Sequence, residues 1–127
     1  EQVIGTTMKT VYEVKNDTPQ INRLPVLNFL DDKEGKPVAI NQVIGRRPVF
    51  TAGNSDGDYQ MLQWTSSSPA PHFEMIVHHT DSIREWKYDR TSSIGKLDKG
   101  LDDAAKYQWM IVEMKNDWNV VYPFEKK

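Results

Sequence analysis

Residues 48–62 read PVFTAGNSDGDYQML, and this stretch changes character at its centre. It begins as a short apolar run, passes through a polar loop at residues 53–58, and continues as an amphipathic segment. The pattern predicts a buried strand, a tight turn that Gly53 allows, and then a helix. A strand that leads through a loop into a helix is half of a βαβ motif, so the stretch predicts a parallel sheet with packed helices.

The same alternation continues on both sides of this stretch. Upstream, a short helix is predicted at residues 37–45, because Pro37 suits its first turn and Gly45 its C-terminal end. Downstream, the pattern predicts strands at residues 72–80 and 109–117, helices at residues 82–90 and 93–108, and an extended tail at residues 119–124.

The N-terminal part has a different pattern. β-branched and apolar residues alternate roughly within residues 2–17, and turn-forming residues occupy 16–20, which predicts a strand and a small β flap or hairpin. We therefore expect a single α/β unit over residues 1–127, with the strand and flap in residues 1–35. Residues 36–127 are predicted to form a Rossmann-like, mostly parallel sheet with helices on both faces.

Composition narrows the classes of partner. The formal net charge is −2, and positive and negative residues are interspersed, so nothing favours nucleic acid or an anionic membrane as a partner. No apolar run is long enough to cross a membrane. The chain has no cysteine, which excludes disulfides and thiolate chemistry and leaves both a cytoplasmic and a periplasmic location open.

The polar loop is the predicted site. In open parallel α/β sheets, ligands bind where the strands end, and residues 53–58 would follow such an end. Lys36 stands at the start of the preceding helix, and that helix also begins at the carboxyl edge of the sheet. Carboxylates suit Mg²⁺, whereas helix N-terminal amides and a lysine suit phosphate. The alternative is purely structural, since Asn and Asp are also preferred in turns and helix caps.

Several segments carry a family resemblance. A lysine before a short helix, then a strand, then GNSDGDYQML resembles the third and fourth motifs of haloacid-dehalogenase-like (HAD) hydrolases, particularly their phosphoserine-phosphatase-type members. The segments VIGTTM, YEVKND and LNFLDDKEGKPVAINQVIG are similar to the strand, flap and lysine-bearing segments of that family. VHHTD, EWKYDR, IGKLDKGLDDA and MKNDW resemble the C-terminal part of a bacterial branch, so the resemblance covers nearly the whole chain.

The resemblance implies a Mg²⁺-dependent phosphatase that transfers a phosphoryl group to an aspartate and then hydrolyses the phosphoaspartate. Lys36 matches the family lysine that stabilises the nucleophile and the phosphoryl oxygens. Asn54 and Asp58 match the residues that hold Mg²⁺ or its waters, with Asp56 as a substitute. An aspartate is commoner where Asn54 stands, which predicts weaker metal binding. The loop positions that would surround the phosphate are Gly53 and Ser55.

The nucleophile of the family is missing. Its motif is an apolar strand that ends in D-x-D-x-T or D-x-D-x-S, and the nearest acidic pair, Asp31 and Asp32, lacks this spacing and comes too late in the order. We therefore expect this chain to be the C-terminal part of a longer hydrolase, with the nucleophile and any cap domain before Glu1. The intact protein would act on a small phosphorylated metabolite, and the isolated chain would be inactive.

Two other interpretations stay open from the residues alone. One is a Rossmann-like module that binds a metal or an anion without chemistry, and the other is a truncated chain that self-associates through unpaired strand edges. Further candidates for the site are His78 and His79, of which at most one can face it, because neighbouring strand residues point to opposite sides. Asp81 would cap the helix predicted at residues 82–90, in a loop at the same edge.

Overall fold

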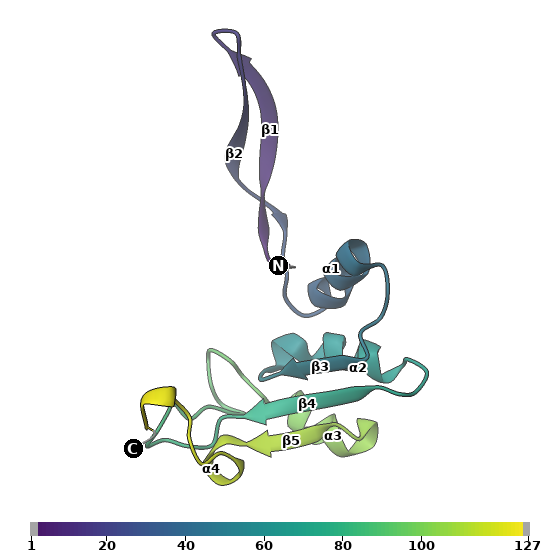
Figure 1. Ribbon diagram of the computed structural model, residues 1–127, viewed down its shortest axis with the longest axis vertical. Helices are drawn as coiled ribbons and strands as arrows, with labels where there is room; N and C mark the ends of the chain where they lie inside the picture. The colour runs from purple at the N-terminus through teal and green to yellow at the C-terminus, as the bar shows by residue number, and fades with distance from the viewer. Residues whose placement is uncertain (1–2, 126–127) are drawn as a thin grey trace.

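The structure, a computed structural model, describes residues 3–125. Its first two strands, β1 (Thr7–Lys15) and β2 (Thr18–Phe29), pair as an antiparallel hairpin that projects away from the remainder of the fold (Figure 1). Asn16 and Asp17 join the strands with φ angles of 51° and 58°, which is the left-handed geometry that suits a two-residue hairpin turn. The predicted hairpin is therefore present, and it is longer than the small flap that we expected.

The alternating elements form a parallel sheet, as the sequence predicts, and its three strands lie in the order β3–β4–β5. Its strands are β3 (Phe50–Gly53), β4 (Phe73–His78) and β5 (Met110–Glu113). The main helices are α1 (Gly35–Ile44), α2 (Tyr59–Ser66) and α3 (Lys99–Tyr107). A 3₁₀ turn, η1 (Asp56–Asp58), links β3 to α2. Together these strands and helices form a mixed α/β architecture.

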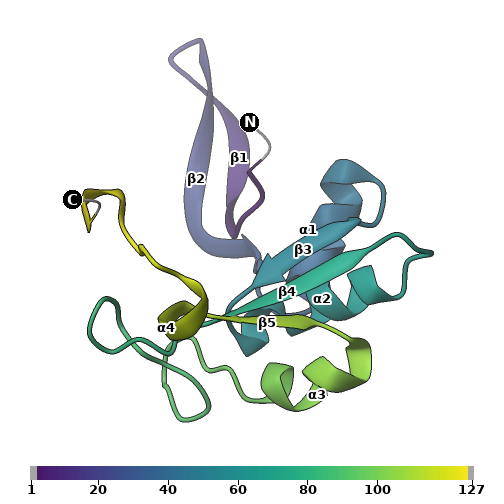
Figure 2. The ribbon, with the colours of Figure 1, turned by 60° about the horizontal axis from the view of Figure 1, so that its bottom comes forward.

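Helices α2 and α3 lie on the same face of the sheet (Figure 2). This follows from topology, because strands added in one direction by right-handed crossovers place their connecting helices on one side. The core between these helices and the sheet consists of Tyr59, Leu62, Ile76, Leu97, Ala104 and Trp109. Helix α1 packs against α2. None of the helices in residues 3–125 is long and apolar enough to cross a membrane.

The opposite face of the sheet is apolar and largely uncovered. Strand register and alternation assign to this face Phe50, Ala52, Phe73, Met75, Val77, Met110 and Val112. Phe50 and Phe73 stack with ring centroids 5.8 Å apart, yet they remain 54% and 41% exposed. Parallel sheets are normally covered on both faces. Within residues 3–125 the structure shows the helical layer on one face, so the second layer stays a prediction.

The segment between β4 and α3 differs most from expectation. The helix predicted at residues 82–90 does not form, and the chain makes turns there instead. Asp81 Oδ1 accepts hydrogen bonds from the backbone N–H groups of Ile83 and Arg84, at 2.9 and 3.0 Å. The Arg84 guanidinium then donates to backbone carbonyls of residues 114, 115, 118 and 119. Ile83 and Trp86 are both highly exposed in these turns, so the segment lacks the tertiary packing of an apolar face that stabilises most short helices.

Three further boundaries differ from the sequence prediction. The helix predicted at residues 93–108 begins only at Lys99, because residues 93–98 form bends and irregular backbone in which Gly95 has a φ angle of 68°. The strand predicted at residues 109–117 ends at Glu113, where the short helix α4 (Met114–Asp117) begins. The predicted extended tail includes a 3₁₀ turn, η2 (Pro123–Glu125).

Candidate functional site

Two loops meet at the carboxyl end of β3. The backbone N–H of Lys33, just before α1, donates to the Gly57 carbonyl at 3.0 Å. Lys36, in the first turn of α1, places its Nζ 3.4 Å from Asp58 Oδ1. The lysine and the acidic loop, which are separated in sequence by a helix and a strand, therefore form one cluster at the sheet edge where ligands bind in this class of fold.

Asp58 organises the polar loop through its other oxygen. Oδ2 accepts hydrogen bonds from the backbone N–H groups of Asn54 and Ser55, at 2.9 and 3.3 Å, and lies 3.4 Å from Ser55 Oγ. Ser55 Oγ in turn accepts from the Gly57 N–H at 3.3 Å, which completes a capping box at the start of η1. Asp58 is buried. Its Oδ1 therefore faces Lys36 while Oδ2 holds the loop closed.

Two glycines permit this close packing. A Cβ atom added to Gly53 would lie 2.4 Å from Asp58 Cβ, closer than any pair of non-bonded carbons can approach. A Cβ at Gly57 would lie 2.6 Å from Asp32 Oδ1. The contribution of Gly53 is thus steric, because it lets the β3 backbone pass directly against the Asp58 side chain.

Asp56 has a separate role in the structure. Its carboxylate reaches the start of α3 and accepts from the backbone N–H groups of Asp98, Lys99 and Gly100, at 2.9–3.2 Å. These are donors that a helix leaves unpaired at its N-terminus. Asp56 thus acts as a helix cap from 42 or more residues away, and its two oxygens are engaged there rather than beside Lys36. A metal-binding role for Asp56 receives no support from these contacts.

A small pocket opens beside Asp58. It has a volume of about 370 Å³ and is lined by Ala52, Gly53, Asn54, Asp58, Val77 and His79. His79 is therefore the histidine of the pair that reaches the candidate site. His78 faces Asp89 instead, with its Nε2 3.8 Å from Asp89 Oδ2. Asp81 lies outside the pocket lining and pairs with Arg84.

The loop after β4 contributes two residues that sequence reasoning did not select, Glu85 and Tyr88. Glu85 Oε2 lies 2.6 Å from His79 Nδ1, and the Tyr88 ring stacks on the His79 ring. Burial raises the pKa of Tyr88, and the negative charges of Glu85 and Asp58 raise it further. The Tyr88 hydroxyl is therefore close enough to the site to be affected by the charge of Asp58. No pattern in the sequence identified this pair, because residues 82–90 were assigned to a helix.

The oxygen donors at the site suit Mg²⁺ only in part. Asp58 and the exposed Asn54 line the same pocket. Mg²⁺ accepts such hard oxygen ligands, keeps several waters, and commonly uses one or two carboxylates together with a phosphate. However, residues 3–125 contain no group of three or more His, Asp or Glu side chains that could hold a metal ion. Asn54 and Asp58 therefore fit a magnesium site as two of its ligands, with the remaining ligands supplied by water, substrate or another segment.

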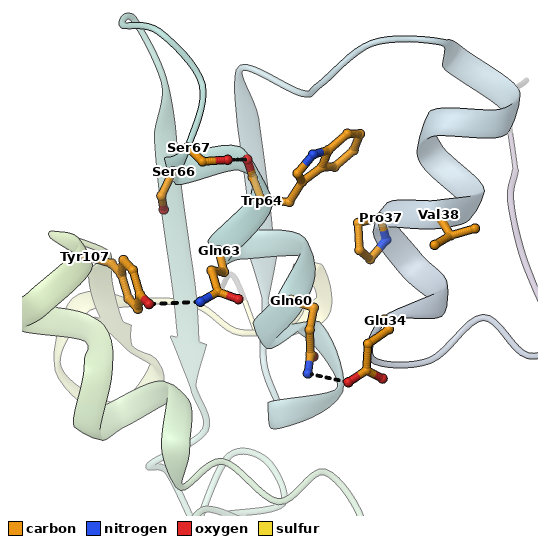
Figure 3. Close-up of a pocket in the computed structure, with 9 residues that line it drawn as sticks. All are labelled: Glu34, Pro37, Val38, Gln60, Gln63, Trp64, Ser66, Ser67 and Tyr107. Atoms are coloured by element: carbon orange, nitrogen blue, oxygen red, sulfur yellow. Dashed lines mark hydrogen bonds between the residues drawn. The ribbon is translucent and has the colours of Figure 1, made fainter.

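A larger cavity of about 650 Å³ lies between α1 and α2 (Figure 3). Its lining consists of Glu34, Pro37, Val38, Gln60, Gln63, Trp64, Ser66, Ser67 and Tyr107. Two of its polar side chains are paired within the lining, since Gln60 donates to Glu34 at 3.1 Å and Gln63 donates to the Tyr107 hydroxyl at 2.9 Å. This cavity lacks a cation beside a carboxylate, so we place the candidate site at Lys36 and Asp58.

Neither protein-family models nor curated proteins give a match to this chain. The functional assignment accordingly depends on the geometry of the site and on the sequence resemblance.

Proposed function

We propose that this chain supplies the lysine and metal-ligand half of a Mg²⁺-dependent, HAD-type phosphohydrolase site. The observation that carries the proposal is the 3.4 Å approach of Lys36 Nζ to Asp58 Oδ1 at the carboxyl end of β3. This contact brings together Lys36 of the lysine motif and Asp58 of the GNSDGDYQML motif. The side chain of Lys36 is 28% exposed, so the ammonium is held by Asp58 and is still accessible to a ligand.

The cationic and the oxygen-bearing side chains of the site would have different roles. The Lys36 ammonium would bind a phosphoryl oxygen and stabilise the negative charge that develops there. The Asn54 amide oxygen and Asp58 Oδ1 would ligate Mg²⁺, which supplies further neutralisation of phosphoryl charge when it is bound. Ser55 and Gly53 would keep the loop in the conformation that presents these groups. The substrate class is a small phosphomonoester.

The nucleophile would come from a segment outside these residues. Within residues 3–125, β3 pairs with β4 alone, so its other edge can accept a further strand. A strand added there in parallel would end beside Lys36 and Asp58, which is where an aspartate nucleophile is required. The uncovered apolar face has room for a second helical layer, and both additions would complete a Rossmann-like core with helices on both faces.

The first test is hydrolysis of an aryl phosphate by the purified chain, with Mg²⁺ and then with a chelator. We expect no turnover, because covalent phosphoryl transfer requires its nucleophile. Turnover that the chelator abolishes would show that residues 1–127 contain a complete site, and the nucleophile would then be sought at Asp31, Asp32 and Asp56.

The second test follows Mg²⁺ and inorganic phosphate binding by NMR, because binding does not require the nucleophile. We expect Mg²⁺ to shift the signals of Asn54 and Asp58, and Lys36→Gln to weaken phosphate binding. Lys33→Gln is the matched control, since Lys33 lies on the same loop and its contact with Gly57 is a backbone hydrogen bond. Equal phosphate affinity in Lys36→Gln and the wild type would contradict the assigned role of Lys36.

A second candidate function is self-association of a non-enzymatic module. The uncovered apolar face favours it, as do the outer edges of β3 and β5, which are unpaired in the described part of the chain, because such surfaces drive pairing with another chain. A chain that sediments as a stable oligomer and binds neither Mg²⁺ nor phosphate would favour this interpretation over the phosphohydrolase site.

A further inference from the structure

A carboxylate and an imidazole form a closely held pair at the edge of the candidate site. His79 follows β4 directly and lines the pocket that Asn54 and Asp58 also line. Its Nδ1 lies 2.6 Å from Glu85 Oε2. The Glu85 side chain is only 7% exposed, and its Oε1 is buried without a hydrogen-bond partner in the described part of the chain. Because an unpaired buried carboxylate is costly, the contact with His79 is the interaction that stabilises Glu85 in this position.

The rest of the loop also fixes the His79 ring. The Tyr88 ring stacks on it with centroids 4.6 Å apart and planes 20° apart, and the Tyr88 backbone N–H donates to the His79 carbonyl at 3.1 Å. Gly95 allows Tyr88 to sit this close, because a Cβ at Gly95 would lie 2.8 Å from Tyr88 Cε2. The imidazole is thus held by a hydrogen bond in its plane and by a ring against its face.

These contacts leave one ring nitrogen for the pocket. Glu85 engages Nδ1, so Nε2 is the nitrogen of His79 that remains for a ligand, and the side chain is 20% exposed. A histidine nitrogen is a poor ligand for Mg²⁺, which prefers oxygen. Residues 3–125 also contain no group of three His, Asp or Glu side chains that would suit zinc here. Nε2 is therefore better suited to an oxygen of the substrate than to a metal ion.

We propose that His79 contacts the phosphate ester through Nε2, and that Glu85 is the residue that positions His79. This inference rests on the proposed function, because that function places a phosphoryl group beside Lys36 and Asp58. As an imidazolium, His79 carries a proton on each ring nitrogen, so Nδ1–H would donate to Glu85 while Nε2–H donates to a phosphoryl oxygen in the pocket. His79 and Lys36 would then together select a phosphate over a neutral group.

The experiment is a titration of the isotope-labelled 127-residue chain with inorganic phosphate at saturating Mg²⁺, followed by NMR. His79→Asn keeps an amide near the position of Nδ1 for Glu85 and removes Nε2, so we expect about tenfold weaker phosphate binding. His79→Gln places an amide near the position of Nε2, so we expect it to recover most of the affinity. Glu85→Gln should weaken binding several-fold, because it changes the hydrogen bond that orients the ring.

His78→Asn is the matched control. His78 precedes His79 in the chain, but its Nε2 is buried on the side of Asp89 and it is absent from the pocket lining. We expect His78→Asn to bind phosphate like the wild type. Thermal melting of each variant shows whether it is folded. In the wild type, the ¹⁵N signal of His79 Nε2 should shift when phosphate is added, whereas the signal of a purely structural histidine would not shift.

The outcomes separate this inference from the proposed function. Unchanged phosphate affinity in a folded His79→Asn variant would overturn the role of His79 and leave that of Lys36 intact. An equal loss in His78→Asn and His79→Asn would also overturn it, since the effect would then be structural. Mg²⁺ shifts at Asn54 without any phosphate binding would overturn this inference and the phosphate role of Lys36, and would leave the metal-ligand roles of Asn54 and Asp58 intact. Absence of both Mg²⁺ and phosphate binding would overturn the inference and the proposed function together.

Discussion

Replacing Asp56 distinguishes a structural carboxylate from a metal ligand within the same loop. In Asp56→Ala the backbone N–H groups of Asp98, Lys99 and Gly100 lose their acceptor, and Gly100 is buried. Loss of a helix cap costs about 1 kcal/mol, and a partly buried N–H without a partner costs about 1–3 kcal/mol more. We therefore expect Asp56→Ala to lower the free energy of unfolding by about 3 kcal/mol.

That loss corresponds to a decrease of about 10 °C in melting temperature for a domain of this size. Urea denaturation followed by tryptophan fluorescence measures it, because the buried Trp109 lies in the core that α3 covers. Asp56→Asn keeps one oxygen acceptor and should lose about 1 kcal/mol. Asp31→Ala is a control that removes the same charge from another loop. Wild-type stability in Asp56→Ala, together with weakened Mg²⁺ binding, would refute the capping role and restore Asp56 as a metal ligand.

Three other substitutions test separate parts of the structure. Gly53→Ala forces a Cβ against Asp58, so we expect a loss of about 1–3 kcal/mol in urea denaturation and weaker phosphate binding; unchanged values would contradict the close approach. The Arg84 backbone N–H and guanidinium lower the pKa of Asp81 to about 2, from an ordinary value of 3.8. The ionised Asp81 carboxylate therefore contributes its full stabilisation above about pH 4, and this contribution decreases as the pH falls toward 2. Asp81→Asn should remove this part of the acid dependence when melting is measured as a function of pH. Phe73→Asp adds a charge to the uncovered sheet face, so we expect sedimentation to shift toward monomer without a loss of stability; an oligomer that is unaffected would exclude this face as the contact.

Part of the candidate site could be predicted from local sequence. Gly53 followed by Asn, Ser and Asp predicts a tight turn into a helix, and the structure has a capping box there with Ser55 and Asp58 as partners. The position of Lys36 followed from topology, because the helix before a parallel strand begins at the carboxyl edge of the sheet. The metal and phosphate roles of these residues stay predictions, which the binding experiments test.

The hairpin shows a limit of pattern reading. The turn predicted at residues 16–20 includes Pro19, yet Pro19 lies within β2, as does Pro25. In a two-stranded ribbon each strand is an edge strand, so a proline can place its missing N–H on the solvent side without loss of a ladder hydrogen bond. Local sequence does not show whether a strand has one neighbouring strand or two, and this decides whether a proline is tolerated. The prediction therefore underestimated the length of the hairpin.

The sequence by itself determined the features that depend on neighbours along the chain, namely the alternation of strands and helices from residue 36 onward and the turn at residues 53–58. Only the tertiary structure decided which polar side chains serve which purpose. Asp56 caps a helix that begins more than 40 residues later, and Glu85 holds His79 from a segment whose pattern is compatible with a helix. The physical reason is that an isolated carboxylate has the same chemistry in any loop, whereas its role is set by the donors that the fold brings within hydrogen-bond distance.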